Sequence, residues 1–216
     1  MRNIWEIIDR LRGVSGCPWD RKQTPASVQT YLIEEAHEAA AAVRANDVKE
    51  VAEELGDLLF MTLFLVHLYE EEGLFRLDEV CETVCEKMRR RHPHVFGDLP
   101  VRTAQEVVDN WEKIKADEKA STGKVTQGIP ASLPALMRGH RMLSRLSHEK
   151  QPCWNDPAAQ IADFSLKHGN LLQPLNDGVA PPPEAFGELL LSLVNLARLK
   201  GYQAETCLHK ALSRLE

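Results

Sequence analysis

Four carboxylates occur in two pairs, and both pairs have the spacing of one helix face. Glu35 and Glu38 lie in the segment EEAHE, and Glu54 and Asp57 lie in the segment EELGD that follows. A step of three residues turns a helical side chain by about 300°, so the members of each pair point to one side. The short turn between the segments, at residues 46–47, makes the two helices antiparallel neighbours. We therefore expect four carboxylates to converge in the gap between them.

Convergence of this kind favours a metal site. Like charges in a partly dry site repel, and a hard divalent cation relieves that repulsion with the oxygen ligands it prefers. We expect Mg²⁺, with Mn²⁺ as the alternative. No histidine occupies the matching positions of the second segment, which argues against a di-iron centre. The competing interpretation, solvated acidic helix faces, suits Glu34, Glu50 and Glu53. It does not suit Asp57, because that residue interrupts an apolar run.

Two later segments offer groups that would suit a phosphorylated ligand. Lys87 and Arg91 are four residues apart at the end of a predicted helix, and such cations bind phosphate oxygens. Trp111 and Lys115, also four apart, would set a stacking plane beside a cation. The alternatives are charge complementarity at a helix end for the cations and core packing for Trp111. With the acidic cluster, these groups provide a metal, cations and a stacking surface for a triphosphate.

The elements that must position these residues all read as helices, and no alternating run indicates a strand. Thr24-Pro25 is an N-cap followed by proline at the first helical position, Asp47 with Glu50 resembles a capping box, and Gly73 is a helix stop. Residues 148–183 are expected to be a loop. The expected helices are 3–12, 25–45, 47–72, 78–91, 103–120, 136–147, 184–200 and 204–215.

Composition and charge exclude several classes of protein. The chain has 216 residues, a net charge of −6 and no excess of basic residues, so nucleic acid is not the expected partner. The longest apolar run, residues 55–69, is interrupted by polar residues and is shorter than the ~20 needed to cross a bilayer, and no secretory signal is visible. Five cysteines without a CxxC pair indicate neither a disulfide framework nor a zinc knuckle. A reduced, cytoplasmic protein without membrane contact is expected.

The two halves of the chain contain similar segments. CPWD at 17–20 is echoed by PCWND at 152–156, and ELGDLL at 54–59 by AFGELL at 185–190. We expect a catalytic domain at 1–120, a linker at 121–134 and a degenerate repeat at 135–216. The second copy has Ala185 in place of Glu54 and Glu188 in place of Asp57, and residues 164–176 contain no acid. It is therefore expected to be catalytically inactive.

In this order and spacing, the segments CPWDRKQT, EEAHE, EELGDLLF, RRHPHVFGD and WEKIKADEK resemble those of MazG-type all-α nucleoside triphosphate pyrophosphohydrolases. The resemblance covers about residues 1–120, and the remainder less distinctly. It implies an all-α antiparallel helical bundle with tandem repeats and hydrolysis of nucleoside triphosphates to monophosphate and pyrophosphate, a house-cleaning activity on the nucleotide pool. It also implies the following roles: Glu35, Glu38, Glu54 and Asp57 as Mg²⁺ ligands, Lys87, Arg91, Trp111 and Lys115 as nucleotide contacts, and Trp19 and Gln23 as residues of the opening loop that reach the base.

We expect Glu34, Glu35 and Glu38 to take part in catalysis, with Glu34 or Glu53 accepting the proton of the attacking water. The sequence does not decide whether the α- or the β-phosphorus is attacked. One alternative is a non-catalytic nucleotide-sensing or oligomerisation module, and another is a narrower enzyme acting on a single nucleotide such as dUTP or phosphoribosyl-ATP. The apolar length of the helix at 47–72 predicts burial in a homodimer.

Overall fold

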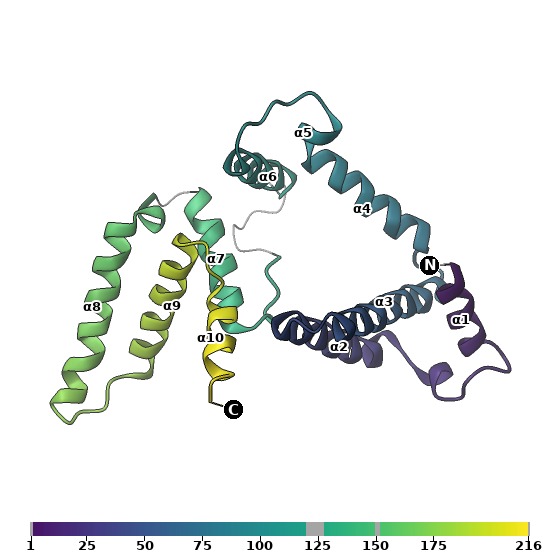
Figure 1. Ribbon diagram of the computed structural model, residues 1–216, viewed down its shortest axis with the longest axis horizontal. Helices are drawn as coiled ribbons and strands as arrows, with labels where there is room; N and C mark the ends of the chain where they lie inside the picture. Colours follow the sequence, from purple (N-terminus) through teal and green to yellow (C-terminus); the bar gives the residue numbers. More distant parts are fainter. Residues whose placement is uncertain (1, 120–127, 150–151, 216) are drawn as a thin grey trace. The chain divides into compact units, whose positions relative to one another are not determined.

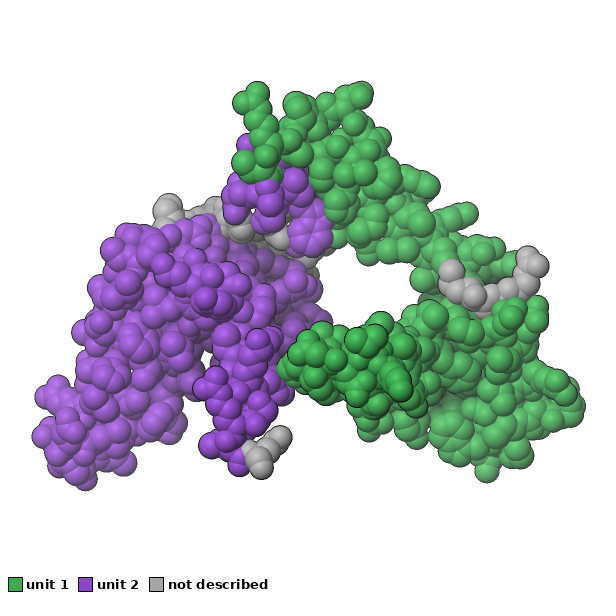
Figure 2. Space-filling view, viewed as in Figure 1, with its two compact units in different colours: residues 1–103 green, residues 104–216 purple. Residues whose placement is uncertain are grey.

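The structure is a computed structural model that describes residues 2–119, 128–149 and 152–215. Figure 1 shows that these residues form helices joined by turns and loops, and no strand occurs among them. The chain divides into two compact units, residues 1–103 and 104–216 (Figure 2). Each unit is described by itself below.

Unit 1 is built around two long helices that fold back on each other. These are α2, Pro25–Ala45, and α3, Val48–Glu71, and their pairing is the most extensive helix contact of the described chain. The helix α1, Arg2–Arg12, packs against α3, and the single-turn helix η1, Asp20–Lys22, lies in the loop between α1 and α2. The helices α4, Leu77–Arg91, and α5, Pro93–Phe96, complete the unit.

Local chemistry explains the ends of the α2–α3 pair. The Thr24 hydroxyl accepts a hydrogen bond from the Ser27 N–H, and the Asp47 carboxylate accepts from the N–H groups of Lys49 and Glu50. Asn46 takes a left-handed conformation, φ 57°, that reverses the chain between the helices. Gly73, at φ 69°, follows the end of α3. These caps confirm the expected boundaries to within one or two residues.

The core of unit 1 lies at the end of α3 that is remote from the expected metal ligands. Ile8 of α1, Val28 of α2 and Leu63, Phe64 and Leu68 of α3 form one buried cluster. Burial of each such side chain stabilises the fold by about 1.5–3 kcal/mol. This packing joins α1 and the start of α2 to the second half of α3.

Unit 2 repeats the order of a helix, a single-turn helix and a long helix pair. These are α7, Ala135–Glu149; η2, Pro152–Asn155; α8, Pro157–Asn176; and α9, Pro183–Leu199. The helices α8 and α9 pack on each other, and α9 also contacts α7. The helices α6, Ala104–Lys119, and α10, Ala204–Leu212, complete the unit. The two units therefore share this order of elements, and the tandem repeat stays a prediction.

The expectation of a loop over residues 148–183 was wrong, because α8 occupies 157–176. Asp156 caps this helix by accepting from the Ala158 N–H, and Pro157 stands at its first position. The sequence of this helix has a weak helix propensity, because it contains Gly169, Asn170 and Pro174. The sequence pattern therefore did not predict a helix here. Packing against α9 stabilises it instead. The sequence also did not predict the short helix α5.

Two further expectations concern the linker and the membrane. Part of the expected linker at 121–134, residues 121–127, lies outside the described residues. None of the described helices combines the length and apolar character that a bilayer crossing requires.

Candidate metal and substrate site

The structure brings three of the four expected metal ligands together. One carboxylate oxygen each from Glu35 and Glu38 on α2 and from Glu54 on α3 all lie within 4.8 Å of one another. The spacing of three residues on α2 and the packing of α2 on α3 produce this approach, as the sequence predicted. Among the described residues, no other acid, histidine or cysteine group forms such a cluster.

Asp57 lies one helical turn beyond Glu54 at an exposed position, contrary to the expectation that a solvated face does not suit it, and its charge acts on the cluster. The pKa of Glu35 is raised by burial and then by the negative charges of Asp57, Glu38 and Glu34, although a hydrogen bond with Glu54 acts in the opposite direction. The pKa of Glu54 is also raised, by burial and then by Glu38, Glu50, Glu35 and Asp57. The cluster therefore holds more negative charge than its surroundings balance.

One atom of the cluster indicates what would balance that charge. The Oε2 atom of Glu54 is buried and has no hydrogen-bond partner, although a buried carboxylate oxygen ordinarily has one. Carboxylate oxygens from two facing helices are the hard ligands that Mg²⁺ and Mn²⁺ prefer. The residues present therefore fit a divalent cation held by Glu35, Glu38 and Glu54, with Asp57 beside them.

Trp19 and Gln23 line a small apolar cavity of about 40 Å³ between η1, α2 and α3. Tyr31, Phe60 and Phe64 provide aromatic walls, and the Trp19 and Tyr31 ring centroids are 5.9 Å apart. The Gln23 amide is held within the loop region, because its nitrogen donates to the Trp19 carbonyl and its oxygen accepts from Ser27. Trp19 lines the cavity and is half exposed, so part of its side chain is accessible to a ligand.

Lys87 and Arg91 lie one turn apart on α4, as their spacing predicted. Both are half-buried, and Arg91 is in the last turn, where a cation complements the helix dipole. His92 follows, and its ring is hydrogen-bonded to the Met88 carbonyl. Phosphate binding by the two cations stays a prediction.

Trp111 and Lys115 form the expected cation–aromatic pair on α6. The Lys115 ammonium lies 4.4 Å from the centroid of the Trp111 ring. The pair belongs to unit 2, whereas the carboxylates belong to unit 1. Its contact with a nucleotide stays a prediction.

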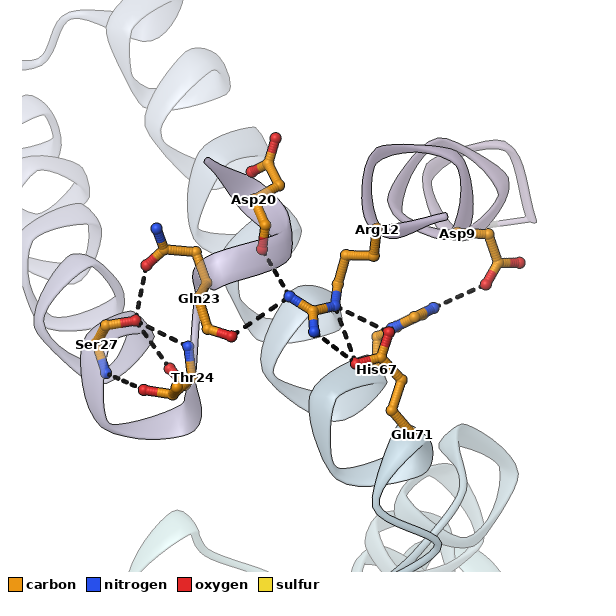
Figure 3. Close-up of polar contacts among 8 residues, drawn as sticks. All are labelled: Asp9, Arg12, Asp20, Gln23, Thr24, Ser27, His67 and Glu71. Atoms are coloured by element: carbon orange, nitrogen blue, oxygen red, sulfur yellow. Dashed lines mark hydrogen bonds and ion pairs between the residues drawn. The ribbon is translucent and has the colours of Figure 1, made fainter. Parts of the chain in front are cut away.

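Sequence reasoning missed a polar network beside the cavity, shown in Figure 3. Arg12, at the end of α1, forms an ion pair with Glu71, at the end of α3. His67 contacts Asp9 through one ring nitrogen and faces Glu71 through the other. Arg12 and Glu71 are 59 residues apart, so no local spacing links them. The only signal was His67 itself, an ionisable group in an apolar helix that needs polar partners.

Comparison with known proteins agrees with this geometry. Residues 23–96, which carry the carboxylate cluster, match the model of the MazG nucleotide pyrophosphohydrolase domain. The nucleoside triphosphate pyrophosphohydrolase of Escherichia coli K12 is 36% identical, over 97% of this chain and 82% of that protein. The nucleoside triphosphate pyrophosphohydrolase/pyrophosphatase MazG of Thermotoga maritima is 37% identical, over 95% of this chain and 78% of that protein.

A solved structure also matches. The crystal structure of a mazG-related protein from Thermotoga maritima is 28% identical, with a TM-score of 0.47, over 53% of this chain and 98% of that one. The long sequence matches are the decisive ones, because each exceeds 30% identity across nearly the whole chain. The chain therefore belongs to the MazG nucleotide pyrophosphohydrolase family.

Proposed function

We propose that this protein hydrolyses nucleoside triphosphates to nucleoside monophosphate and pyrophosphate with Mg²⁺ held by Glu35, Glu38, Glu54 and Asp57. The observation that carries the proposal is the cluster of three carboxylates within 4.8 Å, with a buried and unpartnered oxygen on Glu54. The activity named for the Escherichia coli and Thermotoga maritima relatives supports the same reaction. A role in clearing unwanted nucleotides from the pool follows from this chemistry.

When bound, the divalent cation offsets the charge of the triphosphate and lowers the pKa of a coordinated water. Around it, Glu34 and Glu53 are the candidates to accept the proton of the attacking water. Each precedes a proposed ligand by one position, Glu34 beside Glu35 and Glu53 beside Glu54. Both are exposed, so a proton accepted there passes readily to solvent.

The remaining proposed roles concern the substrate. Lys87 and Arg91 bind the phosphates and stabilise the negative charge that develops on the leaving pyrophosphate. The base stacks on the half-exposed Trp19 at this cavity, beside Gln23, because an aromatic ring suits a flat ligand. Trp111 and Lys115 provide a second stacking surface with a cation.

We further propose that the protein works as a homodimer. No residue of α4, all of which the structure describes, is buried, although Val80 and Val84 lie one turn apart on its surface. Leu55 and Leu59 of α3 are exposed in the same way. A partner copy would cover such apolar positions. A single species of 24.3 kDa in light scattering would contradict this assembly.

The domain organisation is proposed as expected from the sequence, with a catalytic domain at 1–120, a linker at 121–134 and a degenerate repeat at 135–216. All five cysteines are free thiols, which supports a reducing compartment such as the cytoplasm.

The direct test is pyrophosphate release from a panel of ordinary and modified nucleoside triphosphates, with Mg²⁺ and with EDTA. Metal-dependent release of pyrophosphate and monophosphate would support the reaction, and the panel would show whether the enzyme is broad or selective. A folded protein that binds Mg²⁺ and nucleotide but turns over none of the panel would contradict it.

The position of attack needs a second measurement. Hydrolysis in ¹⁸O-water places the label on the product whose phosphorus is attacked. Label in the monophosphate means attack at the α-phosphorus, and label in pyrophosphate means attack at the β-phosphorus.

A further inference from the structure

We propose that Arg12 and Glu71 are positioning residues that fix the Trp19 loop, residues 13–23, at the mouth of the aromatic cavity. The inference rests on the proposed function, because it assigns the cavity to the base of the substrate. Neither residue touches the carboxylate cluster in the geometry described above. Their effect is expected on the binding of the base and not on the chemical step.

Arg12 uses its whole guanidinium in two directions. Toward α3, Nε donates to both carboxylate oxygens of Glu71, at 2.9 and 3.0 Å, and Nη2 donates to Oε2 at 2.6 Å. Toward the loop, Nη1 donates to the carbonyl of Asp20 at 2.6 Å and to that of Gln23 at 3.4 Å. Figure 3 shows this arrangement, with Arg12 between the loop and Glu71. The planar fork of arginine suits such simultaneous contacts, and a lysine could not make all of them.

The two loop residues whose carbonyls Arg12 binds also line the cavity. Asp20 and Gln23 line the cavity together with Trp19, and Gln23 donates to the Trp19 carbonyl at 3.2 Å. The guanidinium also lies 5.6 Å from the centroid of Phe64, another wall residue. Arg12 therefore contacts lining residues of the cavity from both the loop and α3.

The start of the loop is held by close backbone packing against α1. The Cys17 N–H donates to the Leu11 carbonyl at 2.8 Å, and the Gly16 N–H to the Gly13 carbonyl at 2.8 Å. A Cβ at Gly16 would lie 2.1 Å from the Leu11 carbonyl oxygen, so no other residue fits there without displacement of the loop. The loop thus moves with the end of α1, and α1 is tied to α3 by Arg12.

His67 lies between Glu71 and Asp9, beside the Arg12–Glu71 pair. His67 Nδ1 lies 3.5 Å from Glu71, and His67 Nε2 lies 2.7 Å from Asp9. His67 is buried, and its ring also packs against Trp5, with centroids 5.1 Å apart. The Arg12 side chain is 11% exposed and the Glu71 side chain 39%. A pair this sheltered on one side is better ordered than a surface ion pair.

The test compares steady-state kinetics of Arg12→Gln and Glu71→Gln with the unaltered enzyme. We expect KM for the preferred triphosphate to rise about tenfold in each variant, which is the effect of 1.4 kcal/mol, with kcat within about twofold and Mg²⁺ affinity unchanged. The double variant should be no worse than the worse single variant, because both remove one interaction. Arg12→Lys, which keeps the charge and loses the fork, should be intermediate.

Asp163→Asn provides the matched control. It removes a different ion pair, Lys167–Asp163 at 2.8 Å in unit 2, and should leave KM unchanged. Equal KM values for Arg12→Gln, Glu71→Gln and the unaltered enzyme would overturn the proposal. A fall in kcat at constant KM would do the same, because it would place the pair in the chemical step or in global folding.

A measurement without turnover separates this inference from the proposed function. Hydrogen exchange should show faster exchange at the Cys17, Lys22 and Gln23 amides in Arg12→Gln, with the amides of α2 and α3 unaffected. If no triphosphate is hydrolysed by any variant, the proposed function fails while the exchange result still reports on the loop. Unchanged exchange in the loop overturns the positioning role whatever the kinetics show.

Discussion

The helix pairs α2–α3 and α8–α9 have the same order of elements. They differ at the positions that carry the proposed metal ligands in α2–α3. Counted eleven and fourteen residues from the N-caps Thr24 and Asp156, α2 has Glu35 and Glu38 whereas α8 has Lys167 and Asn170. Lys167 is ion-paired to Asp163 on its own helix. On the facing helix, two residues before the glycine, unit 1 has Glu54 and unit 2 has Ala185.

The difference also appears in how each pair satisfies its buried polar groups. In unit 1 the carboxylates leave a buried oxygen without a partner, at Glu54. In unit 2 the buried Asn195 donates to Gln160 across α8 and α9 at 2.6 Å, and Arg198 donates to Asn195 and to the Trp154 carbonyl. Buried polar groups are ordinarily hydrogen-bonded, and those of Asn195 meet this rule within α8–α9. This difference agrees with the proposal that α2–α3 binds the cation and that α8–α9 is structural.

The largest expected effect comes from neutralising an acid of the α2–α3 pair. Glu38→Gln and Asp57→Asn should each lower kcat by on the order of 10²-fold or more, because metal-assisted stabilisation of the transition state is lost. The matched change Glu188→Gln, at the position that follows the glycine of α9, should leave kcat unchanged. Pyrophosphate release measures all three.

Stabilisation by metal adds a second readout to the same variants. Mg²⁺ should raise the melting temperature of the unaltered protein and of Glu188→Gln, and should not raise that of Asp57→Asn. If Glu188→Gln lost as much activity as Asp57→Asn, the contrast between the helix pairs would be wrong, since α8–α9 would then contain a functional acid.

Much of this arrangement could be predicted from the sequence, because it depends on local spacing. Local features are sufficient to predict that α2 and α3 face each other with their acids inward. These features are the carboxylates three residues apart, the caps Thr24 and Asp47, and the short turn between the helices. The Lys115–Trp111 contact follows from a spacing of four in the same way.

What the sequence did not predict depends on contacts between distant segments or on packing. The ion pair of Arg12 and Glu71 requires α1 to dock at the end of α3, and nothing in either segment specifies the other. The helix α8 was missed because Gly169 and Pro174 oppose it locally, and its contact with α9 outweighs them. Asn195, which occurs in an otherwise apolar helix, was not recognised as a buried link to Gln160.

The next effect tests the structural assignment of α8–α9. Asn195→Ala removes the hydrogen bond to Gln160 and leaves that buried amide and Arg198 with fewer partners. We expect the free energy of unfolding to fall by about 1–3 kcal/mol, measured by urea denaturation, with kcat and KM unchanged in the absence of urea. Asn170→Ala, at an exposed position of α8, is the control and should change neither. A loss of activity in folded Asn195→Ala would show that unit 2 contributes to catalysis.

A smaller effect concerns the pH dependence of the unfolding free energy, which should differ between the two units. The pKa of His140 is lowered by burial and then by the charges of Arg198 and Arg141, so the folded protein disfavours its protonation. Below the ordinary value of 6.5, the unfolded chain takes up this proton first, and the stability of unit 2 should fall as the pH decreases from 6.5 toward the lowered pKa. His140→Gln should flatten this dependence of the unfolding free energy between pH 7 and about 5. If the unfolding free energy of His140→Gln depended on pH as steeply as that of the unaltered protein, His140 would not be the group responsible.

The smallest effect lies in unit 1 and at lower pH. The pKa of Glu71 is lowered chiefly by its hydrogen bonds with Arg12, so the folded state favours the carboxylate. The stability that this pair contributes is present above the ordinary value of 4.5 and should be lost as the pH falls through the lowered pKa of the folded protein. Because Glu71 is 39% exposed, the contribution should remain below about 1 kcal/mol. Unfolding free energies of the unaltered protein and Glu71→Gln should therefore differ at pH 6 and converge at about pH 3. Convergence already above pH 4.5 would mean that Arg12 does not hold the carboxylate in its charged form, and the two units would then be distinguished by their carboxylates alone.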